Sequence, residues 1–422
     1  MKVDVKELSE LKRQVSIVVP AETIQDEIGK KYAELRKNVT IKGFRKGKAP
    51  MDRIKAQYDD SVKAEVTDEV IRSTFPKVIM QEELKVASYP TVTYADFAED
   101  GDLLYIAEVE VFPKLDQILY DDLEVTVEEI EVEDDDVDEF VEVLRKRFST
   151  LRPVDREVQD SDVVIADLKK LWDPGMALSD DSFENQEIDL GNNQTVSEFK
   201  EQLPGMKSGD EKEIEVNYPD DYPDSTFAGT QLKYSILVRD VTERILPEFD
   251  DAFAKQTNLA ETALELRLKI REDIKSRIDE SQDKNKRSQI IDQVCEKNKI
   301  PVPESLMDSY LGNIVEEFKK RYKDVDEKEI RKSYRDVGIK TIRWNILYHK
   351  LSEQEEIEVL PADTEDRIKR FANHYQMSFE EAKENLAKSG TVADIKDSIL
   401  EEKVLDFLVN KAKVNNTGKT DK

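Results

Sequence analysis

The sequence has few of the residues that build metal sites and cross-links. Among 422 residues there is one cysteine, Cys295, and there are two histidines, His349 and His374. An intramolecular disulfide cannot form from one cysteine, and a Cys/His structural zinc site lacks its ligands. We therefore expect no metal and no cofactor. We expect both histidines to be ordinary helix residues and the cysteine to be a small buried apolar residue.

Glycine (13 residues) and long apolar stretches are also scarce. The glycines do not have the spacing of a dinucleotide fingerprint or a P-loop, and there is no Gly-x-Ser-x-Gly elbow. The longest apolar run is five residues, from Leu103 to Ala107, whereas a membrane-spanning helix needs about 20. The first ten residues lack the apolar stretch of a signal peptide. We therefore expect a cytoplasmic protein with no membrane partner.

Charge is abundant and unbalanced. Charged residues make up 38% of the chain, hydrophobic residues make up 38%, and the formal net charge is −29. This composition is typical of a helix-rich globular protein with a sizeable core. The length favours about three domains, and we predict an α+β multidomain fold.

The first two segments differ in their periodicity. Residues 1–112 combine two amphipathic helix patterns with alternating strand patterns, including a hairpin turned by Asp100-Gly101. Residues 113–150 form a connector, with a strand followed by a helix over 134–148. That helix begins with acidic and ends with basic residues, which suits the helix dipole.

The last two segments also differ from each other in their periodicity. Residues 151–245 hold five of the thirteen glycines and three strand patterns, which predicts a compact, turn-rich β domain. Residues 246–422 have helical periodicity nearly throughout and predict an all-helical segment. We expect the tail after Val414 to be frayed.

The sharpest local feature is a basic loop between the two helix patterns of the first segment. Residues 30–55 hold ten Lys/Arg and two acidic residues, a net charge of +8, which leaves −37 for the rest. A concentrated positive site on a negative body favours a polyanionic partner. Phe44 beside Arg45 adds an aromatic of the kind that anchors protein or RNA surfaces. Charge and spacing alone leave open both a docking element and a plain solvated loop.

The loop sequence GFRKGKAP resembles the ribosome-docking signature of bacterial trigger factor, Gly-Phe-Arg-x-Gly-x-x-Pro. The resemblance extends along nearly the whole chain, including residues 203–223, 245–256, 298–306 and 399–414. It implies the following ribosome-binding residues: Gly43, Phe44, Arg45, Lys46, Gly47, Lys48 and Pro50.

The resemblance also implies a function and an architecture. A trigger factor is an elongated, ATP-independent chaperone that docks at the exit tunnel of the large ribosomal subunit. There it contacts a ribosomal protein and rRNA and shields unfolded nascent polypeptides. Its middle domain is an FKBP-like peptidyl-prolyl isomerase, its C-terminal helices form a body with arms, and it tends to form a homodimer away from the ribosome.

Prolyl isomerisation needs neither a nucleophile nor a metal, because an apolar aromatic pocket can desolvate the imide and favour its twisted state. The family's phenylalanine is replaced here by Leu168, and Ser197-Glu198 replaces the usual Pro-Gly. Asp167 matches an acid of the family's first strand. Residues 173–186 lack the family's Phe-Glu-Gly pattern, and we expect Phe183 to substitute in part. The pocket positions that the resemblance implies are Leu168, Val196, Phe199, Tyr222 and Tyr234.

These departures predict a conserved fold with weakened isomerase activity, and leave open a vestigial domain that only contacts clients. Two further alternatives are a free-standing prolyl isomerase with helical extensions, and a ribosome- or RNA-binding adaptor that uses the basic loop.

Overall fold

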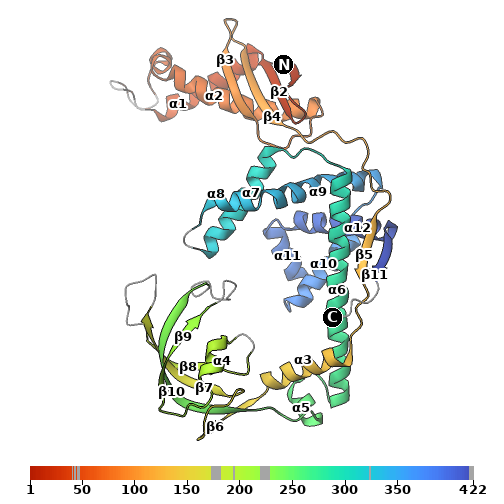
Figure 1. Ribbon diagram of the computed structural model, residues 1–422. Coiled ribbons are helices and arrows are strands. Elements are labelled where there is room, and N and C mark those ends of the chain that lie inside the picture. The colour runs from red at the N-terminus through yellow and green to blue at the C-terminus, as the bar shows by residue number, and fades with distance from the viewer. Residues whose placement is uncertain are drawn as a thin grey trace. The chain divides into compact units, whose positions relative to one another are not determined.

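The computed structural model (Figure 1) describes residues 1–39, 41, 44, 48–172, 182–192, 195–218, 229–322 and 325–417. The chain forms two compact units. Within the described residues, the first unit joins 1–128 to 283–417, and the second is 129–282. Both units mix helices and strands, so the predicted α+β multidomain class is confirmed.

The first unit begins with a four-stranded antiparallel sheet. Apolar and polar residues alternate along its two central strands, so that one face is fully buried while the other is half-buried. The predicted hairpin forms between the last two strands, and Gly101 in its turn has a φ of +87°. The strand order is β1 (Lys2–Glu7), β2 (Lys12–Val19), β4 (Leu103–Glu110) and β3 (Thr91–Phe97).

Two helices pack with this sheet and with each other. Helix α1 spans Ala21–Asn38 and helix α2 spans Met51–Gln81, and each begins directly after a proline, Pro20 or Pro50. Proline fixes the backbone angle that the first turn of a helix needs and lacks an N–H that would go unbonded there. The apolar residues of both helices join the sheet in one core.

The rest of the first unit is a helical body. Its core takes Leu347 and Leu351 from α9 and Val404 and Leu408 from α12, all fully buried, together with Ile118 of the connector. Cys295 lies in the same core and is 5% exposed, as expected from the sequence. The helices are α6 (Ala263–Lys297, second half), α7 (Glu304–Arg321), α8 (Glu327–Ser333), α9 (Arg335–Gln354), α10 (Pro361–His374), α11 (Phe379–Lys388) and α12 (Val392–Lys411).

The prediction that residues 246–422 are all helical, with a frayed tail after Val414, was wrong for residues 413–417. These residues form strand β11 (Lys413–Thr417), which pairs in parallel with β5 (Glu124–Glu128) (Figure 1). The other edge of β5 is bonded by side chains of α6. The amide of Gln289 donates to and accepts from Thr126 (2.9 and 2.8 Å), and Gln293 does the same for Glu124. The tail is ordered by partners nearly 300 residues away, which its local sequence does not reveal.

The second unit contains a five-stranded antiparallel sheet. Its longest strand, β10, pairs along one edge with β7 and along the other with β9 and then β6. Helix α4 (Ser197–Gln202) packs against β9. Strands β6 and β8 of this sheet were not predicted from the sequence, and neither was β1 of the first unit. The strands are β6 (Thr150–Val154), β7 (Val163–Trp172), β8 (Ser182–Asp189), β9 (Glu211–Asn217) and β10 (Gln231–Ile245).

The second unit also holds a small helical cluster. Helix α3 (Asp134–Arg147) agrees with the predicted connector helix and has the predicted charge polarity. It packs with α5 (Asp251–Gln256) and the first part of α6 through a separate apolar core. None of the helices in the described ranges is long and apolar enough to cross a membrane.

Candidate functional site

The basic loop joins α1 to α2, and the structure describes four of its residues 43–50. Phe44 is 40% exposed, and its N–H donates to the carbonyl of Ile41 at 3.0 Å. Lys48 and Pro50 are exposed, whereas Ala49 is buried in the core of the first unit. The loop therefore has an anchored end at Ala49 and an aromatic side chain open to solvent. Four predicted docking residues lie outside the described residues: Gly43, Arg45, Lys46 and Gly47.

Contacts between α1 and α2 hold the two ends of this loop. The Tyr32 hydroxyl donates to the carboxylate of Asp59 at 2.6 Å, and Lys31 forms an ion pair with Glu65 at 2.9 Å. Burial, together with the bond to Asp59, raises the pKa of Tyr32 to about 12. Lys55 lies 5.7 Å from the centre of the Tyr32 ring. These contacts hold α1 and α2, between which the loop lies, against each other.

In the second unit, three of the predicted pocket residues enter one core. Val196 and Phe199 come from α4 and its N-terminal flank and are each 7% exposed, while Tyr234 of β10 is 3% exposed. Leu168 of β7 packs against this core and is half-buried. It pairs with Ile236, two residues beyond Tyr234, so both side chains belong to neighbouring strands of the same sheet. The structure brings these four residues together, and Tyr222 lies outside the described residues.

An aromatic residue stands next to the position where the family phenylalanine is missing. Phe183 of β8 is the direct cross-strand partner of Leu168 and is 41% exposed. Directly opposed residues on paired strands point to the same face of a sheet. Phe183 can therefore supply part of the aromatic surface that Leu168 lacks.

The two carboxylates near the pocket are already engaged. Asp167 accepts hydrogen bonds from the N–H of Asn185 (2.9 Å) and from Nε of Arg239 (2.6 Å), and these two bonds lower its pKa. Glu198 accepts from the backbone N–H (2.9 Å) and side-chain amide (3.1 Å) of Asn217. Burial alone would raise the pKa of Glu198, but the hydrogen bonds outweigh it and lower the pKa. Both carboxylates are ionised and serve as anchors for neighbouring strands, so neither is placed as a free acid or base.

Arg244 connects the end of α3 to the segment that precedes α4. It donates to the carbonyl of Lys146 (3.2 Å) and the hydroxyl of Ser149 (2.9 Å), and it forms an ion pair with Asp189 (2.6 Å). The backbone carbonyl of Asp189 in turn accepts from the hydroxyl of Thr195 at 2.6 Å. Thr195 directly precedes Val196, so this network positions the pocket end of α4.

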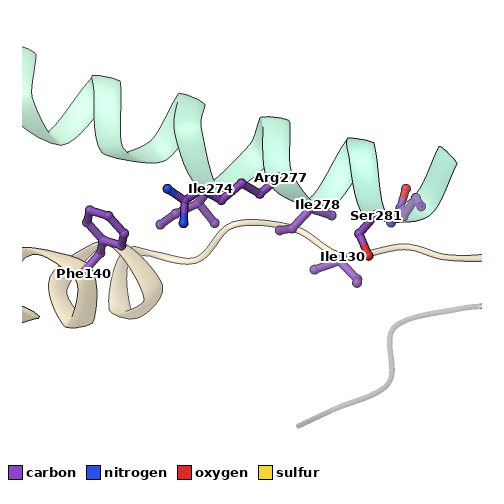
Figure 2. Close-up of a pocket in the computed structure, with 7 residues that line it drawn as sticks. Ile130, Phe140, Ile274, Arg277, Ile278 and Ser281 are labelled. Carbon is purple, nitrogen blue, oxygen red and sulfur yellow. The ribbon is translucent and has the colours of Figure 1, made fainter. Parts of the chain in front are cut away.

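The structure also contains an apolar groove that was not predicted as a site. Figure 2 shows it between α6, α3 and the segment before α3, with a volume of about 280 Å³. Arg277 lies with its guanidinium 5.9 Å from the centre of the Phe140 ring. The sequence does contain a signal for the groove, since the four-residue spacing that buries Leu266 and Ile270 continues beyond the core. The lining residues are Ile130, Phe140, Ile274, Arg277, Ile278, Ser281 and Gln282.

Three family descriptions match the chain. Residues 1–144 match "Bacterial trigger factor protein (TF)", residues 154–242 match "FKBP-type peptidyl-prolyl cis-trans isomerase", and residues 262–410 match "Bacterial trigger factor protein (TF) C-terminus".

Similar proteins match over nearly the full length. A trigger factor of Caldicellulosiruptor bescii is 31% identical over 418 residues, covering 95% of this chain and 94% of that protein. A trigger factor of Geotalea daltonii is 28% identical and covers 98% of both chains. A solved structure described as "Promiscuous Substrate Recognition in Folding and Assembly Activities of the Trigger Factor Chaperone" has a TM-score of 0.54 at 23% identity, over 97% of this chain and 100% of that one. This last match supports the fold.

Proposed function

The chain belongs to the bacterial trigger factor family, and from this premise we propose which of its residues carry the family's functions. It is a chaperone with an FKBP-type peptidyl-prolyl isomerase domain. The observation that carries this conclusion is the match to relatives from end to end, through both trigger factor regions and the isomerase between them. We further propose a cytoplasmic location, a homodimer off the ribosome and division of the chain into segments 1–112, 113–150, 151–245 and 246–422.

We propose that the loop from Gly43 to Pro50 docks the chaperone at the exit tunnel of the large ribosomal subunit. Phe44 is the apolar anchor, since its side chain is open to solvent although the residue is aromatic. Arg45 and the neighbouring lysines bind phosphates of rRNA or acidic side chains of a ribosomal protein. The net charge of −37 on the rest of the chain repels rRNA, so the loop is the part that approaches first. Unfolded nascent chains emerge beside the docked chaperone.

Co-sedimentation with ribosomes tests this assignment. We expect the double variant Phe44→Ala/Arg45→Ala to lose ribosome binding while its circular dichroism stays unchanged. A matched control, Arg72→Ala/Tyr89→Ala, removes one exposed arginine and one exposed tyrosine elsewhere in the first unit and should bind normally. Wild-type binding should weaken as salt rises, because part of the contact is ionic. Undiminished binding of the loop variant would refute the docking role.

We propose that Leu168, Val196, Phe199, Tyr222 and Tyr234 form the proline pocket. The barrier to rotation is about 18–20 kcal/mol because the imide C–N bond has partial double-bond character. That resonance is weakened when the imide leaves water for an apolar surface, since charge separation in the planar form loses its solvation. Burial of Val196, Phe199 and Tyr234 in one core supports this role. The small side chain of Leu168 favours weak activity, and Phe183 compensates in part.

A gain-of-function substitution separates a weakened isomerase from a vestigial one. We expect Leu168→Phe to accelerate the proline-limited refolding of a model protein by the full-length chain, because it restores aromatic surface at a half-buried position. Leu151→Phe is the matched control, since Leu151 is 43% exposed on β6, a strand that pairs with β10 and not with β7. Phe183→Ala should slow the reaction. If wild type and Leu168→Phe both match the uncatalysed rate, the domain is vestigial.

A further inference from the structure

The sheet of the first unit has two outer strands that differ in charge. Strand β1 carries a charged residue at four of its six positions, including Lys2 and Lys6. Strand β3 carries one charge, Asp96, in seven residues. Charged residues, and lysine above all, protect an open strand edge from pairing with another chain. By this criterion β1 is a protected edge and β3 is not.

Strand β3 is also unusually open. Residues 91–96 are all exposed, whereas every second residue of its neighbour β4 is buried. Val92 is 41% exposed, Tyr94 is 46% exposed, and Tyr89 just before the strand is 96% exposed. The pairing with β4 is irregular between Val92 and Tyr94, so that Val92 lies opposite Ala107 and Tyr94 opposite Ile106. Because Ala107 and Ile106 are on opposite faces of β4, both faces of β3 present an apolar or aromatic side chain to solvent.

The backbone of β3 has hydrogen-bonding capacity to spare. Its inner edge pairs with β4, from Thr91 opposite Glu108 to Phe97 opposite Leu103. In the part of the chain that the structure describes, no strand pairs with its outer edge. The pairing is irregular between Val92 and Tyr94, and the N–H of Phe97 is already bonded by the carboxylate of Asp96 at 2.8 Å. Because successive backbone groups of a strand point to opposite edges, other groups of β3 face outward and can bond a further strand.

Charge indicates what this edge accepts. The hairpin over residues 89–102 contains Asp96, Glu99, Asp100 and Asp102 and no basic residue, a net charge of −4. A second copy of this chain would bring the same four acids against them, on a protein whose net charge is already −29. An unfolded chain that is neutral or basic meets no such repulsion, and its own backbone groups lack partners.

We propose that the outer edge of β3 binds an extended segment of an unfolded client as an added strand, selecting segments with alternating apolar residues and no acidic residue. The proposal rests on the chaperone function given above and adds a binding site to it. Strand addition gains its affinity from the main chain, which every polypeptide has. A chaperone that must accept many sequences can therefore take most of its affinity here from the client's main chain, while contacts with Val92 and Tyr94 favour segments with alternating apolar residues.

Hydrogen exchange on the full-length protein tests the location. The probe is a labelled, end-blocked peptide, Lys-Thr-Val-Thr-Val-Thr-Tyr-Val-Lys, and its control replaces the second and third threonines with proline, which removes two backbone donors. We expect the first peptide to slow exchange of the amides in residues 91–97 and the second to leave them unchanged. Protection elsewhere without protection of β3 would overturn the proposal. Concentration-dependent protection of β3 without peptide would also overturn it, because a second copy would then be the occupant.

A charge-matched pair of variants tests the mechanism. Thr91→Lys/Ala95→Lys gives β3 the kind of protection that β1 has, and we expect it to weaken binding of the first peptide at least tenfold. Ser61→Lys/Ala64→Lys adds the same two charges at exposed positions of α2 and should change the affinity less than twofold. Equal affinities of the two variants would overturn the proposal. Both should still co-sediment with ribosomes, so failure here is distinguishable from failure of the docking assignment.

Discussion

Replacement of two glycines inside helices of the body by alanine should change the free energy of unfolding in opposite directions. A Cβ atom added at Gly338 of α9 would lie 2.9 Å from Cδ1 of Tyr310 and 3.0 Å from Sδ of Met307. A Cβ added at Gly312 of α7 would have no neighbouring atom within 4 Å. Gly338 therefore marks the place where α9 passes close to α7, whereas Gly312 has no such role.

The expected magnitudes follow from two opposing effects. Alanine is more favourable than glycine inside a helix by about 1 kcal/mol, so Gly312→Ala should raise the free energy of unfolding by about 0.5–1 kcal/mol. At Gly338 the same gain is opposed by overpacking, which costs about 1–3 kcal/mol when rigid neighbours must move. The Tyr310 ring is such a neighbour. We expect Gly338→Ala to be destabilising by about 1 kcal/mol, so that the two variants differ by about 2 kcal/mol.

Urea denaturation followed by the fluorescence of Trp344 measures this difference. Trp344 lies on α9, is 5% exposed and donates to Glu401 at 2.7 Å, so it reports on the same body. Both variants are made in a Trp172→Phe background to remove the second tryptophan. Unfolding midpoints that fall on opposite sides of the parent's are the expected result. If Gly338→Ala were as stable as Gly312→Ala, the close approach of α7 and α9 would be wrong.

Four further predictions concern single groups. An apolar groove open to solvent can hold apolar segments of unfolded clients. Ile278→Glu, which places a charge in this groove, should therefore weaken suppression of client aggregation measured by light scattering, while ribosome co-sedimentation is unchanged; undiminished suppression would show that the groove does not contact clients. Burial raises the pKa of the Cys295 thiol from 9.0 to about 11, which lowers its thiolate fraction at pH 8 about 100-fold, so iodoacetamide should react slowly until urea is added. In the folded state the pKa of the Tyr32 hydroxyl is about 12, whereas the pKa of a tyrosine in an unfolded chain is about 10. The stability of its unit should therefore be constant below pH 10 and fall between pH 10 and 12, with a smaller fall in Asp59→Asn; a flat profile in denaturant titrations would contradict this. Arg244→Ala should lower isomerase kcat/KM and destabilise the second unit by about 1–3 kcal/mol, and unchanged activity would show that the pocket does not depend on the connector.

The sequence predicted those elements whose period and boundaries are local. The helix over 134–147 has its acidic first turn, its basic last turn and its apolar stripe within one short segment. The hairpin of β3 and β4 has its turn and both alternating strands within twenty residues. Such elements need no knowledge of distant partners.

The elements that were missed depend on partners far along the chain. The sequence of strand β11 has the composition of a polar tail, because the strand's side chains are mostly exposed and its stabilising contacts come from β5. Strand β8 has exposed residues at six of eight positions, so it lacks the alternation by which a strand is found.

The candidate site likewise has a part that could be predicted from local sequence and a part that depends on distant partners. The proposed docking loop is contiguous, so its motif is visible in the sequence. The described residues of the proposed pocket come from three separated elements, and the position of Phe183 opposite Leu168 depends on a strand register that includes an irregularity between Ala166 and Leu168. Spacing along the chain does not determine such a register. The sequence therefore indicated Phe183 as a partial substitute, but not its place opposite Leu168.

The parallel pair of β5 and β11 has a consequence for biosynthesis. Residues up to 128 and residues from 283 onward belong to one compact unit, so the isomerase unit is inserted within it, and β11 pairs with a strand nearly 300 residues earlier in the chain. The body therefore cannot be complete until residues 413–417 have been synthesised. Until α12 and β11 have emerged, β5 lacks its partner strand and the core around Leu408 lacks a helix, so each new copy of this chaperone passes through a stage in which it exposes apolar surface as an unfolded client does.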